Sequence, residues 1–110
     1  MKRVDRSRYT SWLFQAAESF YERGNFDKAL KYFERLIKQH GKVLETPMKA
    51  DCYAYLGDIH LFNEDFSKAV EYLNKAIALD SEFSHYYYLL GMVYQTQENW
   101  RRSIEEFEKA

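Results

Sequence analysis

The chain contains nearly the same 21-residue segment twice, and this repetition strongly constrains how it can fold. The segment "LGDIHLFNEDFSKAVEYLNKA" begins at Leu56, and "LGMVYQTQENWRRSIEEFEKA" begins 34 residues later at Leu90. Both copies begin with Leu-Gly, place an aromatic residue ten positions on (Phe66, Trp100) and end with Lys-Ala. A fixed period of this length is typical of chains that stack one small helical or strand unit on the next.

The spacing of apolar residues identifies the unit as helical. Apolar side chains recur at steps of three and four throughout the chain, and no segment alternates apolar and polar residues long enough to predict a strand. We expect an all-α fold with helices over residues 6–23, 26–40, 47–62, 66–79, 83–97 and 100–110.

Polar residues stand at the expected helix starts. Asn25, Asp65 and Asn99 each precede a helix, where a side-chain oxygen can accept a hydrogen bond from a free backbone amide. Thr46 before Pro47 predicts a capped start for the third helix. Asp80 and Ser81 are the expected caps of the fifth helix.

The copies resemble tetratricopeptide repeats, units of 34 residues in which an aromatic-x-x-Leu-Gly-x-x-Tyr helix precedes an Ala-x-x-x-Phe helix. The third copy carries Tyr87, Leu90, Gly91, Tyr94, Ser103, Phe107 and Ala110 at the family's positions. The second carries Tyr53, Leu56, Gly57, His60, Ala69, Leu73 and Ala76, and the looser first copy carries Leu13, Ala16, Ala17, Phe20, Ala29, Phe33 and Leu36. The resemblance implies one domain over residues 1–110, a right-handed superhelical array of three hairpins with repeats at about 10–43, 50–83 and 84–110.

Two departures from the repeat affect this expectation. The first and second copies are 40 residues apart, measured from Ala29 to Ala69, and Leu36 stands where the other copies have alanine. We therefore expect a wider junction around "KQHGKVLETPM", with a longer second helix or an ordered loop. No polar capping helix follows the last apolar helix, which favours either a fragment of a longer protein or self-association through that helix.

Composition argues against several function classes. The net charge is −1, so no global field favours nucleic acid or an anionic membrane. Four basic residues gather at the start (Lys2, Arg3, Arg6 and Arg8), where we interpret them as a solvated helix start. The single cysteine, Cys52, cannot form an internal disulfide, which favours a reducing, cytoplasmic setting.

The sequence offers no constellation for catalysis, a cofactor or a metal. His40, His60 and His85 lie far apart, without the spacing of metal ligands. His60 takes the place of the family's tyrosine, so we interpret it as a core residue, and Cys52 as a buried, unreactive thiol. We expect a non-enzymatic protein without cofactors.

The family resemblance implies a concave groove lined by the first helix of each pair. The residues at the family's groove positions include acids, aromatic residues and methionine, but no lysine or arginine. The candidate site comprises Phe14, Glu18, Tyr21, Asp51, Tyr55, Asp58, His85, Tyr88 and Met92. Such a surface suits a protein or peptide partner with basic and apolar side chains. The alternatives are that some of these rings pack within the array, with Leu61 and Phe62 evenly balanced, and that the acids are simply solvated.

One function known in the family is expected to be absent. Family members that bind the acidic C-terminal tail of cytosolic chaperones use lysine, asparagine and arginine at set positions. The corresponding positions here hold Phe14, Glu18, Tyr55, His85 and Leu89. The groove therefore predicts no binding of an acidic tail. A scaffold that binds a peptide or helix is the leading interpretation, and self-assembly or a regulatory role within a larger protein are the alternatives.

Overall fold

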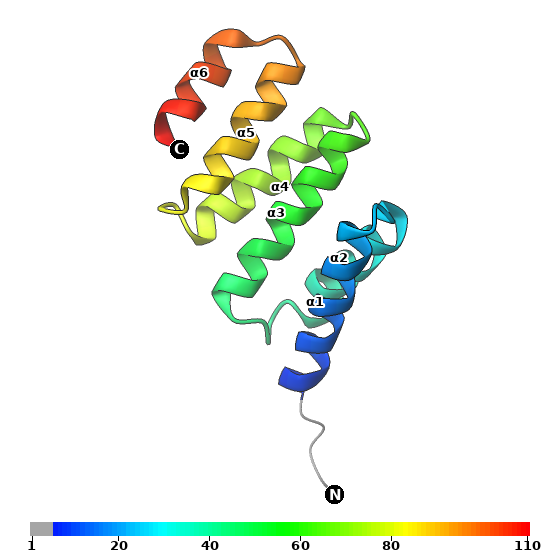
Figure 1. The fold of residues 1–110 in the computed structure, drawn as a ribbon. Coiled ribbons are helices and arrows are strands. Elements are labelled where there is room, and N and C mark those ends of the chain that lie inside the picture. The colour runs from blue at the N-terminus through cyan, green and yellow to red at the C-terminus, as the bar shows by residue number, and fades with distance from the viewer. Residues whose placement is uncertain (1–5) are drawn as a thin grey trace, which may run out of the picture.

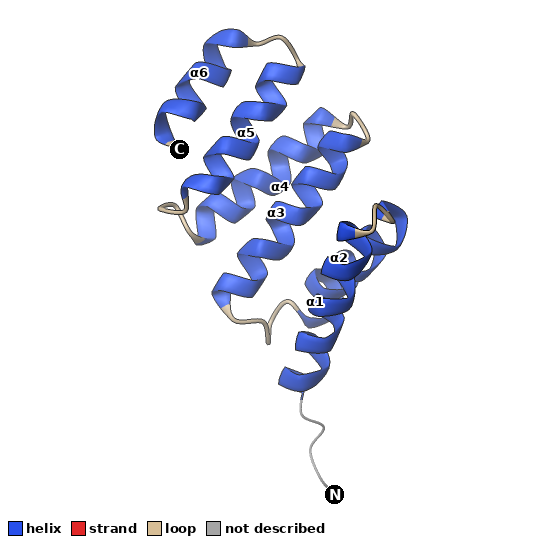
Figure 2. Ribbon diagram, in the orientation of Figure 1, coloured by secondary structure: helices blue, strands red, loops and turns tan. Residues whose placement is uncertain are grey.

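The structure is a computed structural model, and it describes residues 6–110. Within this range the chain forms six α-helices joined by short loops, and it contains no strand (Figure 2). The helices are α1 Arg6–Glu22, α2 Phe26–His40, α3 Thr46–Phe62, α4 Phe66–Leu79, α5 Ser84–Thr96 and α6 Trp100–Lys109. The predicted all-α fold class is confirmed, and each expected helix is present within one residue at either end. Lys2 and Arg3 of the basic cluster lie outside the described residues.

The turn inside each hairpin has the same construction in all three copies. The residue before the cap adopts a positive φ, 79° at Gly24, 62° at Glu64 and 61° at Glu98. The next residue then caps the following helix: the side chains of Asn25, Asp65 and Asn99 accept hydrogen bonds from the backbone amides of Lys28, Lys68 and Arg102. The predicted caps at these three positions are confirmed.

The connections between hairpins differ from the prediction. Glu45, not Thr46, is the N-cap residue of α3, and its side chain makes no capping hydrogen bond. Phe83 holds that place before α5, also without a side-chain bond. Asp80 instead ends α4, and its carboxylate accepts a hydrogen bond from the backbone amide of Glu82 at 3.3 Å. The predicted capping roles of Thr46, Asp80 and Ser81 are therefore wrong. Asp80 forms its hydrogen bond within the loop between α4 and α5 instead of at the start of α5.

The six extra residues between the first two copies mainly lengthen a helix. Helix α3 has 17 residues against 13 in α5. Helix α2 is one residue longer than α4, and the loop over 41–45 is one residue longer than the loop over 80–83. The predicted longer second helix or ordered loop therefore explains only two of the six extra residues, and the longer α3 contains the other four. Leu36 is fully buried in the cluster shared with α1 and α3.

The apolar core continues along the array in two clusters. One unites α1 and α2 with the inner face of α3, and the other unites α3 and α4 with α5. Small residues permit the close helix contacts: a Cβ atom on Gly57 would lie 2.7 Å from Cγ of Leu73, and one on Gly91 would lie 2.5 Å from the ring of Phe107. Such distances are incompatible with packed atoms, so the glycines set how closely the helices approach.

The three hairpins follow one another in series along an elongated molecule of 57 × 28 × 19 Å (Figure 1). Each helix packs on the next one in the chain, and α3 also contacts α5. This arrangement places the first helices of the three hairpins along one side. The repeat limits at 10–43, 50–83 and 84–110 stay predictions.

Candidate functional site

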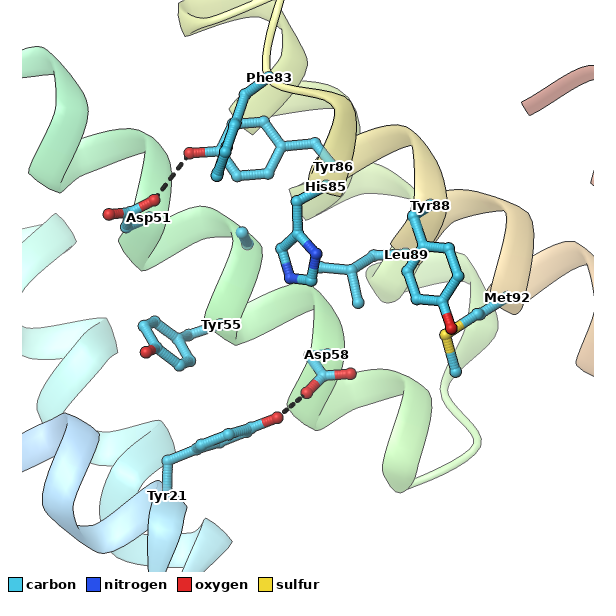
Figure 3. A pocket seen from close by; sticks show the side chains of 11 residues that line it. Tyr21, Asp51, Tyr55, Asp58, Phe83, His85, Tyr86, Tyr88, Leu89 and Met92 are labelled. Carbon is cyan, nitrogen blue, oxygen red and sulfur yellow. Dashed lines mark hydrogen bonds between the residues drawn. The ribbon is translucent and has the colours of Figure 1, made fainter. Parts of the chain in front are cut away.

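A groove with a volume of about 560 Å³ lies between the first helices of the hairpins. Figure 3 shows its side chains, which come from α1, α3, α5 and the residue before α5, Phe83. The lining residues are Tyr21, Asp51, Ala54, Tyr55, Asp58, Phe83, His85, Tyr86, Tyr88, Leu89 and Met92. The groove is therefore rich in aromatic rings and contains two carboxylates.

Seven of the nine predicted site residues line this groove, and only Phe14 and Glu18 do not. The ring of Phe14 packs edge-on against Phe33 and Tyr55, with ring centres 5.9 and 6.1 Å apart. Phe14 is thus a packing residue beside the groove. Glu18 is hydrogen-bonded to Tyr55, which does line the groove. That these residues bind a partner stays a prediction.

Three tyrosine hydroxyls connect the walls of the groove by hydrogen bonds to carboxylates. The Tyr55 hydroxyl donates to Oε2 of Glu18 at 2.8 Å, and the Tyr21 hydroxyl donates to Oδ2 of Asp58. These two bonds run in opposite directions between α1 and α3. A third joins α5 to α3, where the Tyr86 hydroxyl donates to Oδ1 of Asp51 at 2.8 Å. The sequence predicted that these acids are either solvated or bind a ligand. It did not predict their hydrogen bonds to tyrosine.

The tyrosines of these bonds hold their protons strongly. Burial raises the pKa of Tyr21, Tyr55 and Tyr86 well above the ordinary value of 10, and the neighbouring carboxylates raise it further. For Tyr55 these carboxylates are Glu18 and Asp51. Each tyrosine is therefore a neutral donor at any physiological pH, and it leaves the carboxylate charge in place.

The groove has no cation of its own to balance these charges. None of its lining residues is lysine or arginine. The ion pairs found in residues 6–110 join Lys38 to Glu34, Lys75 to Glu71 and Lys109 to Glu106, all on the second helices of the hairpins. The groove carboxylates thus form hydrogen bonds with neutral groups only and give the groove a negative potential.

A smaller apolar recess adjoins the groove at its Asp58 end. It has a volume of about 220 Å³ and shares Tyr21, Asp58 and Met92 with the groove. Its remaining lining residues are Phe26, Leu61 and Phe62. Phe62 is 68% exposed and lies against Phe26 with ring centres 4.6 Å apart. The two residues whose packing the sequence left open therefore differ: Phe62 is largely exposed, whereas Leu61 is partly buried against the core cluster of α3, α4 and α5.

Four lining residues of the groove are not among the nine predicted site residues: Ala54, Phe83, Tyr86 and Leu89. Phe83 precedes α5 and so has no helical position to carry over from the family. Tyr86 is 2% exposed, and its hydroxyl alone reaches the groove wall at Asp51. In the two bonds between α1 and α3 the partners are 37 residues apart, about one helical turn less than the 40 residues that separate the first two copies.

The other candidate residues take structural roles. His60 is buried, and its ring stacks on Tyr72 at 5.4 Å; burial lowers its pKa below the ordinary value. Cys52 is fully buried, and burial, followed by the charge of Asp51, raises the pKa of its thiol to about 12. Both core assignments are confirmed. In the described part of the chain, no cluster of three potential metal ligands occurs, and no helix is long and apolar enough to cross a membrane.

The family of the chain follows from comparison with known sequences. A family profile described as Tetratricopeptide repeat matches residues 8–82, and a second of the same description matches residues 84–110. The chain belongs to the tetratricopeptide repeat family. Tetratricopeptide repeat proteins bind protein or peptide partners, so the chain is of a protein-interaction class.

Two similar proteins are longer than this chain. Human Superkiller complex protein 3 is 27% identical over 97 residues, which is 84% of this chain but 6% of that protein. The crystal structure of MamA superposes with a TM-score of 0.77 at 26% identity, covering 91% of this chain and 55% of that one. The chain thus spans a small part of the first relative and about half of the second.

A third similar structure bears on the expectation about acidic tails. The second tetratricopeptide repeat domain of Spaghetti (RPAP3), bound to the HSP90 peptide SRMEEVD, has a TM-score of 0.77 and 18% identity, covering 91% of this chain and 87% of that one. At this identity the likeness establishes the fold alone. The same fold does accept an acidic peptide, so the fold offers no support for the predicted exclusion of such a peptide, which now depends on the groove side chains alone.

Proposed function

We propose that this chain is a non-enzymatic interaction module that binds a peptide segment with basic and apolar side chains in the groove between α1, α3 and α5. The observation that carries the proposal is the pairing of the groove acids with neutral tyrosines instead of cations. A lysine or arginine of a partner would meet carboxylates that are already oriented and still charged. Oriented charge favours complementary partners and excludes like-charged ones.

The aromatic side chains supply the apolar part of the surface. Tyr88 is 48% exposed, and its ring stacks on His85 with centres 6.2 Å apart. Met92, one turn further along α5, borders both the groove and the apolar recess. Tyrosine and methionine side chains are enriched in protein interfaces, where tyrosine often carries much of the binding energy.

Selection from a displayed dodecapeptide library, followed by calorimetric titration, tests this function. We expect the selected peptides to carry lysine or arginine beside apolar residues. Replacing Tyr88 or Met92 by alanine should weaken their binding about tenfold, or ~1.4 kcal/mol. Val43→Ala is the matched control, because Val43 is 46% exposed, close to Tyr88, and lies in the loop over 41–45 outside the groove. Equal affinity of all three variants would contradict the groove as the binding site.

The exclusion of acidic tails is part of the same proposal. Glu18, Asp51 and Asp58 lie at or beside the groove, where an acidic peptide would meet carboxylates and no lysine or arginine. The peptide SRMEEVD, which the Spaghetti domain binds, is the direct probe. We expect no saturable binding of SRMEEVD, and its binding at micromolar concentration would overturn this exclusion.

Self-assembly through the last helix is the second candidate. Trp100 and Ile104 are 58% and 57% exposed on α6, one helical turn apart. Two such side chains could pack against a second copy. Sedimentation at two concentrations distinguishes the candidates, since a monomer at both contradicts self-assembly. A regulatory role within a larger protein and a cytoplasmic location also stay predictions.

A further inference from the structure

The two acids that line the groove are set at a fixed spacing by one helix. Asp51 and Asp58 are both on α3, seven residues apart, and both line the groove. Seven residues are almost two turns of an α-helix, so the two side chains share a face and their Cα atoms are about 10.5 Å apart. A ligand with two cations would meet two negative points at that separation.

Each of these carboxylates keeps one oxygen available. Oδ1 of Asp51 accepts from Tyr86, and Oδ2 of Asp58 accepts from Tyr21. The second oxygen of each carboxylate has no hydrogen-bond partner among the described residues and is not buried. In Figure 3 the second oxygen of each carboxylate points away from the tyrosine that donates to the first. The tyrosines thus fix the orientation of both acids while leaving each one able to accept a hydrogen bond from a ligand.

The lining between the two acids favours a particular backbone conformation. Aromatic rings border the groove on both sides, with Tyr21 and Tyr55 opposite His85 and Tyr88 (Figure 3). Aromatic-lined grooves suit the polyproline II helix, which is extended, has three residues per turn and needs no backbone hydrogen bonds of its own. In that helix, side chains three residues apart share a face and are about 9 Å apart. This distance is close to the separation of Asp51 and Asp58, and the flexible side chain of a lysine can span the difference.

We infer that the groove selects an extended, proline-rich segment with two basic residues three positions apart and an apolar residue two positions after the second. This inference rests on the proposed function and specifies its ligand. The first cation pairs with Asp51 and the second with Asp58. The apolar residue enters the recess formed with Leu61 and Phe62, which lie one turn beyond Asp58 on α3.

Three synthetic peptides with blocked termini test the inference by fluorescence anisotropy. The first has the core Lys-Pro-Ala-Lys-Pro-Leu, with the lysines three positions apart. The second has the same composition in the order Lys-Lys-Pro-Ala-Pro-Leu, with the lysines adjacent. The third is an alanine-rich helical peptide with lysines seven positions apart, which also matches the acid spacing. We expect the first peptide to bind about tenfold more tightly than either of the others.

Variants that remove the charge of one aspartate at a time test its contact with a lysine of the peptide. Asp51→Asn and Asp58→Asn each retain an oxygen that can accept the tyrosine hydroxyl, so the groove wall is preserved while the charge is removed. Each variant should weaken the first peptide about tenfold and largely abolish its preference over the second. Glu71→Gln is the control, because it removes an exposed charge from α4, outside the groove. Thermal melts of all variants establish that they remain folded.

The outcomes separate the inference from the proposed function. Equal binding of the first two peptides, with weakening by both aspartate variants, overturns the spacing rule but leaves a basic ligand site in place. Tighter binding of the helical peptide overturns the extended conformation in the same way. Failure of all three peptides to bind the folded protein contradicts the inference and the proposed function together.

Discussion

At the scale of single residues, the tyrosine hydroxyls of the groove contribute to stability as well as to binding. The bond from Tyr55 to Glu18 joins two hairpins through a charged acceptor, the stronger class of hydrogen bond. Replacing Tyr55 by phenylalanine should lower the free energy of unfolding by about 1.5 kcal/mol in urea denaturation. Tyr88→Phe is the control, since the Tyr88 hydroxyl has no hydrogen-bond partner in residues 6–110. Equal stability of the two variants would show that the bond contributes nothing.

The raised pKa values of these tyrosines predict how stability depends on alkaline pH. In the unfolded chain a tyrosine loses its proton near pH 10, whereas burial and the adjacent carboxylates raise the pKa of Tyr21, Tyr55 and Tyr86 above that value in the folded state. The folded state therefore binds more protons above pH 10, so the free energy of unfolding is maintained below pH 10 and falls as the pH rises further. Urea denaturation from pH 8 to 11 measures this fall, which should be shallower in Tyr55→Phe. A slope identical in the variant would contradict the assignment.

Single residues also show where sequence reasoning reaches its limit. The positions of Tyr21, Asp58 and Met92 in the groove followed from their places in the repeat, because one face of each first helix must point the same way. The bonds between Tyr21 and Asp58 and between Tyr86 and Asp51 did not follow. They depend on how far one helix is displaced along its neighbour, which the pattern of a single helix does not define.

At the scale of helices and turns, the three hairpin turns offer a comparison within one molecule. Gly24, Glu64 and Glu98 occupy the same left-handed position, which costs a residue with a Cβ atom about 1 kcal/mol. Glu64→Gly should therefore raise the free energy of unfolding by about that amount, and Gly24→Ala should lower it by a similar amount. No atom lies within 4 Å of a Cβ atom built on Gly24, so its effect is purely conformational. Thermal denaturation measures both changes, and an unchanged midpoint in both variants would refute this account of the turns.

The helices themselves were predictable because several signals agreed. Apolar period, repeat length and the caps Asn25, Asp65 and Asn99 all placed the same boundaries. The signals conflicted only between hairpins. Pro47 is tolerated anywhere in the first turn of a helix, so it did not fix Thr46 as the cap. The length of α3 did follow from the sequence, since the expected helix over 47–62 differs from the observed helix by one residue.

At the scale of the whole molecule, the two sets of helices differ in charge. The second helices of the hairpins carry most of the basic residues, and several cover tyrosine rings, as Arg35 covers Tyr32 and Arg102 covers Tyr94. Helix α5 has no charged residue, and the groove acids lie on α1 and α3. The net charge of −1 therefore conceals a separation of charge. Because of this separation, the groove and the opposite side of the molecule attract ligands of different charge.

The central claim is that partners bind in the groove between α1, α3 and α5. Nuclear magnetic resonance tests it most directly, by following every backbone amide while the Lys-Pro-Ala-Lys-Pro-Leu peptide is added. The account predicts saturable shifts concentrated around Tyr55, Asp58 and Met92, with α4 and α6 unchanged. Saturable shifts confined to α2, α4 and α6 would contradict it, because the ligand would then occupy the basic side of the molecule.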